Sequence, residues 1–122
     1  MMIDIEWDTQ FNTAIVMHFN GEWTWHACKE ALQTLLYMRE SRDVRVAYIL
    51  DLHESTLVPR SAHTLLTRLL KSLLKEQPSR VVIIDKLHRL ATLQAMLPFA
   101  ETDGIDYAQT IEEARLYLKR AA

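Results

Sequence analysis

Residues 44–74 decide the fold, and they read VRVAYILDL (44–52), HESTLV (53–58) and PRSAHTLLTRLLKSLL (59–74). The second half of the first stretch is continuously apolar, which indicates a strand covered on both faces. Pro59 suits the first turn of a helix, where its missing N–H costs nothing. The leucines that follow recur at helical spacing and form a broad apolar stripe. The segment therefore predicts a central strand, a short loop and a leucine-faced helix.

Similar patterns extend this unit in both directions. Apolar and acidic residues alternate over 3–8, which indicates a strand with one wet face. Thr24 is a suitable N-cap for the first helix, and Thr110 forms a capping box with Glu113 before the last one. The expected strands are 3–8, 14–19, 44–52, 81–84 and 105–107, and the expected helices are 24–41, 59–76, 87–97 and 110–118.

This order of elements predicts an α/β fold. We expect a small mixed sheet of four or five strands, mostly parallel after an N-terminal hairpin, with about four helices on both sides. The chain has two glycines, three prolines and no Gly/Ser linker, so residues 1–122 are expected to form one domain.

Composition argues against several classes of partner. A net charge of -2 does not favour nucleic acid, whose phosphates require clustered Lys and Arg. No apolar run approaches the roughly 20 residues of a membrane helix, so we expect no membrane insertion. Cys28 is the only cysteine, and the first residues lack the basic-then-apolar order of a signal peptide. A cytoplasmic protein is therefore expected.

Residues 44–71 resemble a STAS domain, the family that includes anti-sigma factor antagonists and the cytoplasmic tails of sulfate transporters. In that family an apolar strand ends in Asp-Leu or Asn-Leu, and Asp-Ser-Ser-Gly precedes an apolar helix after a short loop. Here Asp51 and Leu52 end the strand, and PRSA (59–62) stands where the signature is expected. Only Ser61 is kept, at the position that is phosphorylated in the antagonists. The resemblance implies a STAS-like fold and a non-enzymatic regulatory or scaffolding role.

The resemblance makes Ser61 the candidate phosphoacceptor. A phosphate in the first turn of a helix is stabilised by free backbone N–H groups and the helix dipole, and Arg60 adds a neighbouring cation. Alternatively, Ser61 only caps the helix or packs there. Asp51, His53, Arg60 and His63, in or beside this loop, are candidates for binding a partner or ligand. The alternative for Asp51, which we favour, is that its carboxylate binds N–H groups of the loop.

Trp23 and Trp25 bracket Thr24 before the first helix. Tryptophan is enriched at binding hot spots, so the two indoles are candidates for lining a pocket or facing a partner. The alternative, that they close one end of the core, stays open. Cys28 lies on the apolar stripe of the first helix and is interpreted as a small core residue.

Known catalytic and cofactor-binding motifs are missing from the sequence. There is no Gly-rich phosphate loop, no Gly-x-Ser-x-Gly and no His-Glu-x-x-His. The five histidines show no recognisable metal-ligand spacing. We therefore expect no enzyme, no cofactor and no metal.

Three functions follow as hypotheses. The leading one is a regulatory domain that binds a protein partner, such as an anti-sigma-type kinase, through loop 53–58 and the following helix, with phosphorylation of Ser61 as a switch. The second is a small-molecule or lipid carrier similar to the CRAL-TRIO fold, which requires an apolar cavity beside the leucine helix and the tryptophans. The third is a homodimer formed through the sheet edge or a leucine face.

Overall fold

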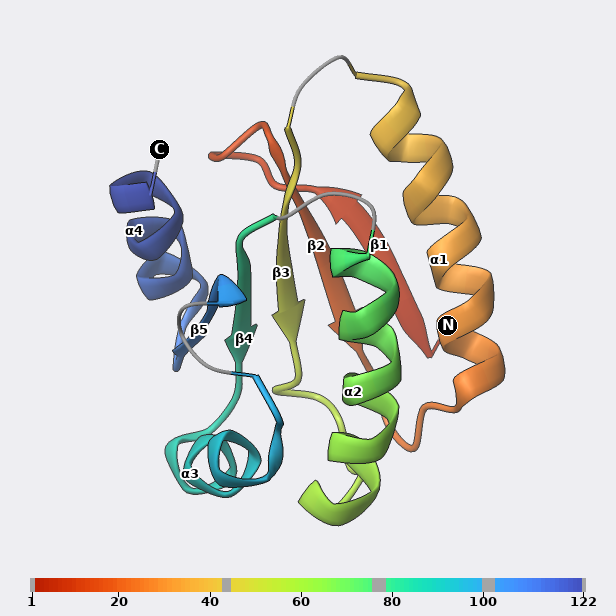
Figure 1. The fold of residues 1–122 in the computed structure, drawn as a ribbon, viewed down its shortest axis with the longest axis vertical. Coiled ribbons are helices and arrows are strands. Elements are labelled where there is room, and N and C mark those ends of the chain that lie inside the picture. Colours follow the sequence, from red (N-terminus) through yellow and green to blue (C-terminus); the bar gives the residue numbers. More distant parts are fainter. Residues whose placement is uncertain (1, 43–44, 76–78, 100–102, 122) are drawn as a thin grey trace.

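After two consecutive strands, helices and strands alternate along the chain (Figure 1). The structure is a computed structural model that describes residues 2–42, 45–75, 79–99 and 103–121. The strands are β1 (Ile3–Trp7), β2 (Ala14–Phe19), β3 (Ala47–Asp51), β4 (Val81–Ile84) and β5 (Ile105–Ala108). The helices are α1 (Trp25–Glu40), α2 (Pro59–Leu74), α3 (Leu87–Met96) and α4 (Ile111–Ala121). The predicted α/β fold is confirmed.

The five strands form one mixed sheet in the order β1-β2-β3-β4-β5. β1 and β2 are antiparallel, and every later pair is parallel. The backbone N–H of Asp8 donates to the carbonyl of Ala14 at 2.8 Å and closes the hairpin. β3 is therefore central, as its apolar sequence predicts, and β1 and β5 are the two edges.

The helices cover the two faces of the sheet unequally. Buried residues of α1, α2 and α3 pack into one hydrophobic cluster with the sheet, and buried residues of α4 pack into a second cluster on the other face. α4 packs against β3, β4 and β5. The side chains of Asp4, Glu6 and His18, on the same face but on β1 and β2, are partly or fully exposed. Among the described helices, none combines the length and apolar character needed to cross a membrane.

Side-chain hydrogen bonds cap the starts of α1 and α4, and an ion pair fastens α4 to the hairpin. Thr24 accepts a hydrogen bond from the backbone N–H of Ala27 at 3.2 Å, which confirms the predicted N-cap. Thr110 accepts one from the N–H of Glu113 at 3.1 Å, as the capping box predicts. On α4, the guanidinium of Arg115 donates to both carboxylate oxygens of the buried Asp8, at 2.6 and 3.0 Å. This bidentate pair fastens α4 to the hairpin.

Several element ends differ from the sequence-based expectation by one to three residues, among them ends of β1, α1, α2, β5 and α4. The strand expected over 44–52 spans only Ala47–Asp51, and residues 43–44 lie outside the described residues. The third helix ends at Met96 instead of residue 97. All of these differences are at element ends, where the flanking chain turns away from the regular hydrogen-bond pattern.

Candidate functional site

The connections that follow β2, β3 and β4 lie at one end of the sheet, which is the lower end in Figure 1. Ligand sites of α/β proteins commonly lie at this end of parallel strands. Loop 52–58, residues 59–61 at the start of α2 and residues 86–88 at the start of α3 form one surface. We refer to this surface as the carboxyl edge. It contains the Ser61 region that the sequence singles out.

Arg89 of α3 holds loop 52–58 in place. Its guanidinium donates to three backbone carbonyls, those of Ser55 at 2.6 Å, Leu52 at 2.9 Å and His53 at 3.3 Å. The Nε atom of Arg89 also donates to Asp85 at 2.8 Å, and Asp85 is only 2% exposed. A charged side chain thus supplies donors to carbonyls of the loop and fastens the loop to α3.

Trp23 braces the same loop from the side of β2. Its indole is 1% exposed and lies 4.7 Å from the ring of Phe19, centroid to centroid. The indole Nε1–H donates to the hydroxyl of Ser55 at 2.8 Å. Gly21 adds two backbone hydrogen bonds, since its N–H donates to the carbonyl of Glu54 and its carbonyl accepts from Thr56, both at 2.9 Å. Trp23 therefore closes one end of the core, and its ring is not accessible to a partner in this structure.

Trp25 has a different environment from Trp23. It is half-buried, and the guanidinium carbon of Arg68 lies 3.9 Å from the centroid of its ring. This cation–π contact joins the start of α1 to α2. Of the two tryptophans that the sequence offers as binding candidates, only Trp25 is partly open to solvent.

The first turn of α2 carries Ser61 as the sequence predicts. The helix begins at Pro59, and Val58 before it provides no side-chain hydrogen bond as a cap. The N–H of Ser61 donates to the carbonyl of Val58 at 3.0 Å, and the side chains of Arg60 and Ser61 are exposed. Ser61 therefore lies at an open helix start. The buried Nδ1 atom of His63, two residues further on, has no hydrogen-bond partner among the described residues.

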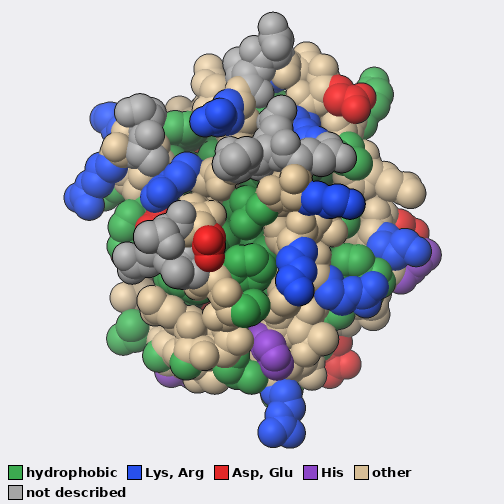
Figure 2. All heavy atoms as spheres, viewed as in Figure 1, with side chains coloured by type: hydrophobic (Ala, Val, Ile, Leu, Met, Phe, Trp, Pro, Cys, Tyr) green, Lys and Arg blue, Asp and Glu red, His purple; other side chains and the backbone are tan. Residues whose placement is uncertain are grey.

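The start of α3 resembles the start of α2. Lys86 precedes the helix without a side-chain cap. Leu87 and Val58, one at each helix start, are 65% and 61% exposed. Neither helix has an acidic residue in its first turn, and α2 contains three cations and no carboxylate. On the face shown in Figure 2, Lys and Arg side chains gather over α2. The carboxyl edge thus combines exposed apolar side chains with two cations, Arg60 and Lys86, and one exposed carboxylate, Glu54.

Asp51 joins the loop to a cluster on the face of the sheet that carries α4. Its carboxylate accepts from the backbone N–H of His53 at 3.0 Å, as the sequence-based interpretation expects. The other oxygen lies 3.2 Å from Nδ1 of His18, and Nε2 of His18 lies 3.2 Å from Glu6. His53 also places its Nδ1 atom 3.4 Å from Asp51. One imidazole therefore lies between two carboxylates.

This arrangement shifts two pKa values in opposite directions. The hydrogen bond to Asp51 raises the pKa of His18; burial acts against this rise, and Glu6 supports it. Burial opposes ionisation of Asp51, but the hydrogen bonds from His18 and from the N–H of His53 outweigh it and lower the pKa of Asp51. The pair is therefore charged over a wider pH range than either group alone.

Asp51→Asn is expected to lower the pKa of His18, because it removes the contact that contributes most to the raised value. Glu6→Gln should lower this pKa less. A ¹H–¹³C NMR titration of the His18 ring measures both, with His26, exposed on α1, as an internal control. An unchanged His18 titration in Asp51→Asn would contradict the contact.

The same shifts set the pH range in which the pair stabilises the fold. Because the pKa of His18 is raised, its contribution to the free energy of unfolding is complete below about pH 6.5. This contribution is lost as the pH rises through the pKa of His18 in the folded state. The lowered pKa of Asp51 means that its contribution is present above about pH 3.9 and is lost as the pH falls through its folded-state pKa.

Metal binding and thiol chemistry find no support at the site. Within the described residues, no group of three His, Cys, Asp or Glu side chains is placed to hold a metal ion. Burial raises the pKa of the Cys28 thiol to about 12, so a thiolate is scarce at neutral pH. Ser55, a loop hydroxyl, is buried against Trp23.

Four residues of this region do not stand out in the sequence. His18 and Glu6 are ordinary strand residues whose meeting requires the antiparallel register. Asp85 and Arg89 have the i, i+4 spacing of a helical ion pair, which is the signal that could have indicated them.

No model of a known protein family matches the chain, and no curated protein matches it in sequence.

Proposed function

We propose that this chain is a non-enzymatic interaction domain that binds a protein partner through the carboxyl edge. The observation that carries the proposal is the bracing of loop 52–58 by Arg89 and Trp23. A loop fixed in this way loses little conformational entropy when a partner binds, which favours affinity. Exposed Val58 and Leu87 supply apolar contacts beside it.

The charge of the edge defines the partner's chemistry. Arg60 and Lys86 flank the apolar side chains and outnumber the one exposed carboxylate of the edge, Glu54, and both helix starts lack acidic residues. A complementary partner presents carboxylates around an apolar contact, because opposite charges guide association and fix register. An anti-sigma-type kinase is the kind of regulator that the STAS resemblance suggests.

Phosphorylation of Ser61 is the regulatory part of the proposal. A phosphate there would lie in the first turn of an uncapped helix, next to Arg60. It would place about two negative charges among the cations of the edge and repel an acidic partner. The exposed hydroxyl of Ser61 is open to a kinase, whereas that of Ser55 is buried and hydrogen-bonded.

The carrier hypothesis requires an apolar cavity beside the leucines of α2 and the two tryptophans. The leucines of α2 at positions 66, 69, 70 and 73 are buried in the main core. These leucines and the two tryptophans do not line the groove between β1 and α1 or the two pockets beside α4. Burial of these leucines in the core favours the interaction domain over the carrier.

Photo-crosslinking in the native host tests the interaction surface. A photoreactive amino acid at position 58 or 87 should give a discrete adduct with one protein. The substitution Arg60→Glu should lower the yield of this adduct. The matched control is position 116, because Leu116 is similarly exposed on α4 on the other face of the sheet. An equal adduct at 116, or none at 58 and 87, would reject the carboxyl edge as the binding surface.

Mass spectrometry of the protein from the same cells tests the switch separately. We expect phosphate on Ser61 and its absence in Ser61→Ala. Phosphate on a different residue would reject the switch while leaving the crosslinking result intact.

A further inference from the structure

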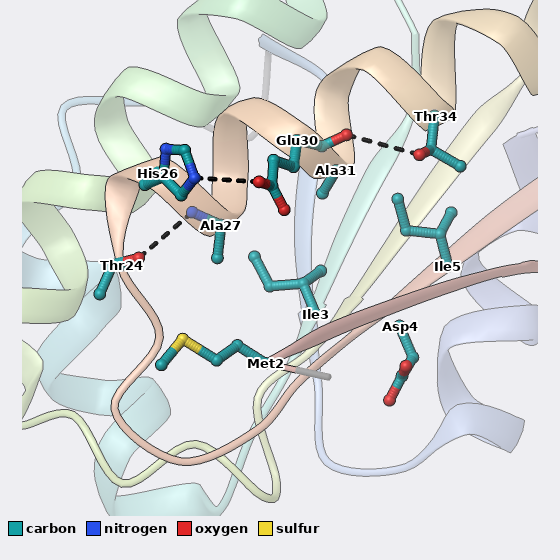
Figure 3. Close-up of a pocket in the computed structure, with 10 residues that line it drawn as sticks. All are labelled: Met2, Ile3, Asp4, Ile5, Thr24, His26, Ala27, Glu30, Ala31 and Thr34. Atoms are coloured by element: carbon teal, nitrogen blue, oxygen red, sulfur yellow. Dashed lines mark hydrogen bonds and ion pairs between the residues drawn. The ribbon is translucent and has the colours of Figure 1, made fainter.

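A groove lies between β1 and the first half of α1, on the opposite side of the protein from β5 (Figure 3). Its volume is about 610 Å³. The floor is formed by apolar side chains of β1, and α1 forms one wall. The described residues that line it are Met2, Ile3, Asp4, Ile5, Thr24, His26, Ala27, Glu30, Ala31 and Thr34.

Only every second residue of β1 forms backbone hydrogen bonds with β2. Met2 accepts from the N–H of Asn20 at 2.7 Å, and Asp8 donates to Ala14 at 2.8 Å. In an antiparallel pair the hydrogen-bonded residues alternate along the strand, so the even-numbered residues of β1 bond to β2. The N–H and C=O groups of the odd-numbered residues, Ile3 to Trp7, therefore point away from β2 and offer a hydrogen-bonding edge.

Side chains at this edge alternate in character. Ile3 and Ile5 pack in the cluster that contains α1, so Asp4 and Glu6 project from the other face of the strand. Asp4 takes a hydrogen bond from the side chain of Asn20, and Glu6 contacts His18. Neither carboxylate forms an ion pair with a described Lys or Arg, and no Lys or Arg is among the residues that line the groove.

A second copy of the chain does not complement this edge. An antiparallel pairing of two β1 strands centred on Ile5 places Asp4 of each copy directly opposite Glu6 of the other. A shift by two residues, which keeps the hydrogen-bonding groups aligned, places Asp4 opposite Asp4 or Glu6 opposite Glu6. Like charges directly opposite one another destabilise a strand pair, so these carboxylates disfavour dimerisation through β1.

We propose that the β1–α1 groove binds an extended segment of another protein, in which Lys or Arg alternates with Val or Ile, as a sixth strand of the sheet. Its backbone pairs with the odd-numbered residues of β1. Its apolar side chains enter the groove against α1, and its cations lie beside Asp4 and Glu6. This is β-augmentation, in which backbone hydrogen bonds give affinity and alternate side chains give specificity. The site is separate from the carboxyl edge.

Binding of a synthetic peptide tests the proposal. A labelled hexapeptide, Lys-Val-Arg-Ile-Lys-Val with blocked ends, is titrated with the full chain by fluorescence anisotropy. A peptide of the same composition with its cations grouped at one end is the control, and we expect it to bind at least tenfold more weakly. Equal binding of the two peptides, or no binding of the alternating one, would overturn the proposal.

Variants locate the site. Asp4→Lys/Glu6→Lys should weaken binding of the alternating peptide about tenfold or more, because two attractive cross-strand pairs become repulsive. The same variant should bind a peptide in which Glu replaces each Lys and Arg more tightly than the wild-type chain does. The control Glu40→Lys/Glu112→Lys changes the net charge equally at exposed positions outside the groove lining and should change the affinity less than twofold. Thr34→Trp, at an exposed position of α1, should fill the groove without altering the net charge, so the alternating peptide should bind this variant more weakly.

NMR and light scattering separate the remaining outcomes. Amide shifts of Ile3, Ile5 and Trp7 should change on titration of the wild-type chain, and those of loop 52–58 should not. Shifts confined to the loop would overturn the β1 site. A dimer that β1 variants dissociate would show that the occupant is a second copy and would also overturn the proposal.

Discussion

Arg89→Met should lower the free energy of unfolding by about 3–5 kcal/mol. The substitution keeps most of the aliphatic volume but leaves the buried carboxylate of Asp85 without its ion pair. It also removes the donor of three loop carbonyls. Urea denaturation measures the loss, and hydrogen exchange should show faster exchange of amides in loop 52–58 than in the wild-type chain.

Two variants separate the ion pair from the loop clamp. Lys86→Met removes an exposed cation one residue from Asp85 and should change the stability by about 0.5 kcal/mol or less. Asp85→Asn/Arg89→Met avoids the buried unpaired charge, so it should recover part of the stability while the loop still exchanges faster. A stable Arg89→Met protein with unchanged exchange would mean that Arg89 does not hold the loop.

Trp23→Ala should cost about 3–5 kcal/mol, the usual loss for a large aromatic side chain removed from a core. Its ring is 1% exposed, contacts Phe19 and donates to Ser55. The smaller change Trp23→Phe keeps most of the apolar contact and should cost about 1 kcal/mol for the lost hydrogen bond. Thermal and urea unfolding measure both.

Trp25→Ala is the matched control, because Trp25 is two residues away but only half-buried. It should cost clearly less than Trp23→Ala. Similar losses for the two tryptophans would contradict the assignment of Trp23 to the core. Reduced crosslinking at position 58 in Trp23→Phe would connect the brace to partner binding.

The two proposed surfaces differ in charge, and His18 lies between them. The carboxyl edge carries Arg60 and Lys86, whereas β1 carries Asp4 and Glu6. A segment attracted to one surface is repelled by the other, which separates their partners by charge. His18 contacts Glu6 of β1 and Asp51 at the start of the loop, so its NMR signal reports on both surfaces.

Local sequence pattern was sufficient for most of the fold. The alternation in β1, the continuous apolar run of β3 and the leucine stripe of α2 each reflect which faces are buried, and burial has the same periodicity as the element itself. The N-cap at Thr24 and the capping box at Thr110 involve neighbours three residues apart. Pro59 marks the start of α2 through its own restricted backbone. These features depend on short stretches of chain, so one sequence reveals them.

The amino-acid sequence alone determined the order of the elements, the position of Ser61 at a helix start and the apolar core. Only the tertiary structure decided that Arg89 holds loop 52–58, that Trp23 is buried while Trp25 is half open, and that His18 joins Glu6 to Asp51. These contacts connect residues between 12 and 37 positions apart. Strand register and helix packing bring such residues together, and neither is encoded in the spacing of residue types within one segment.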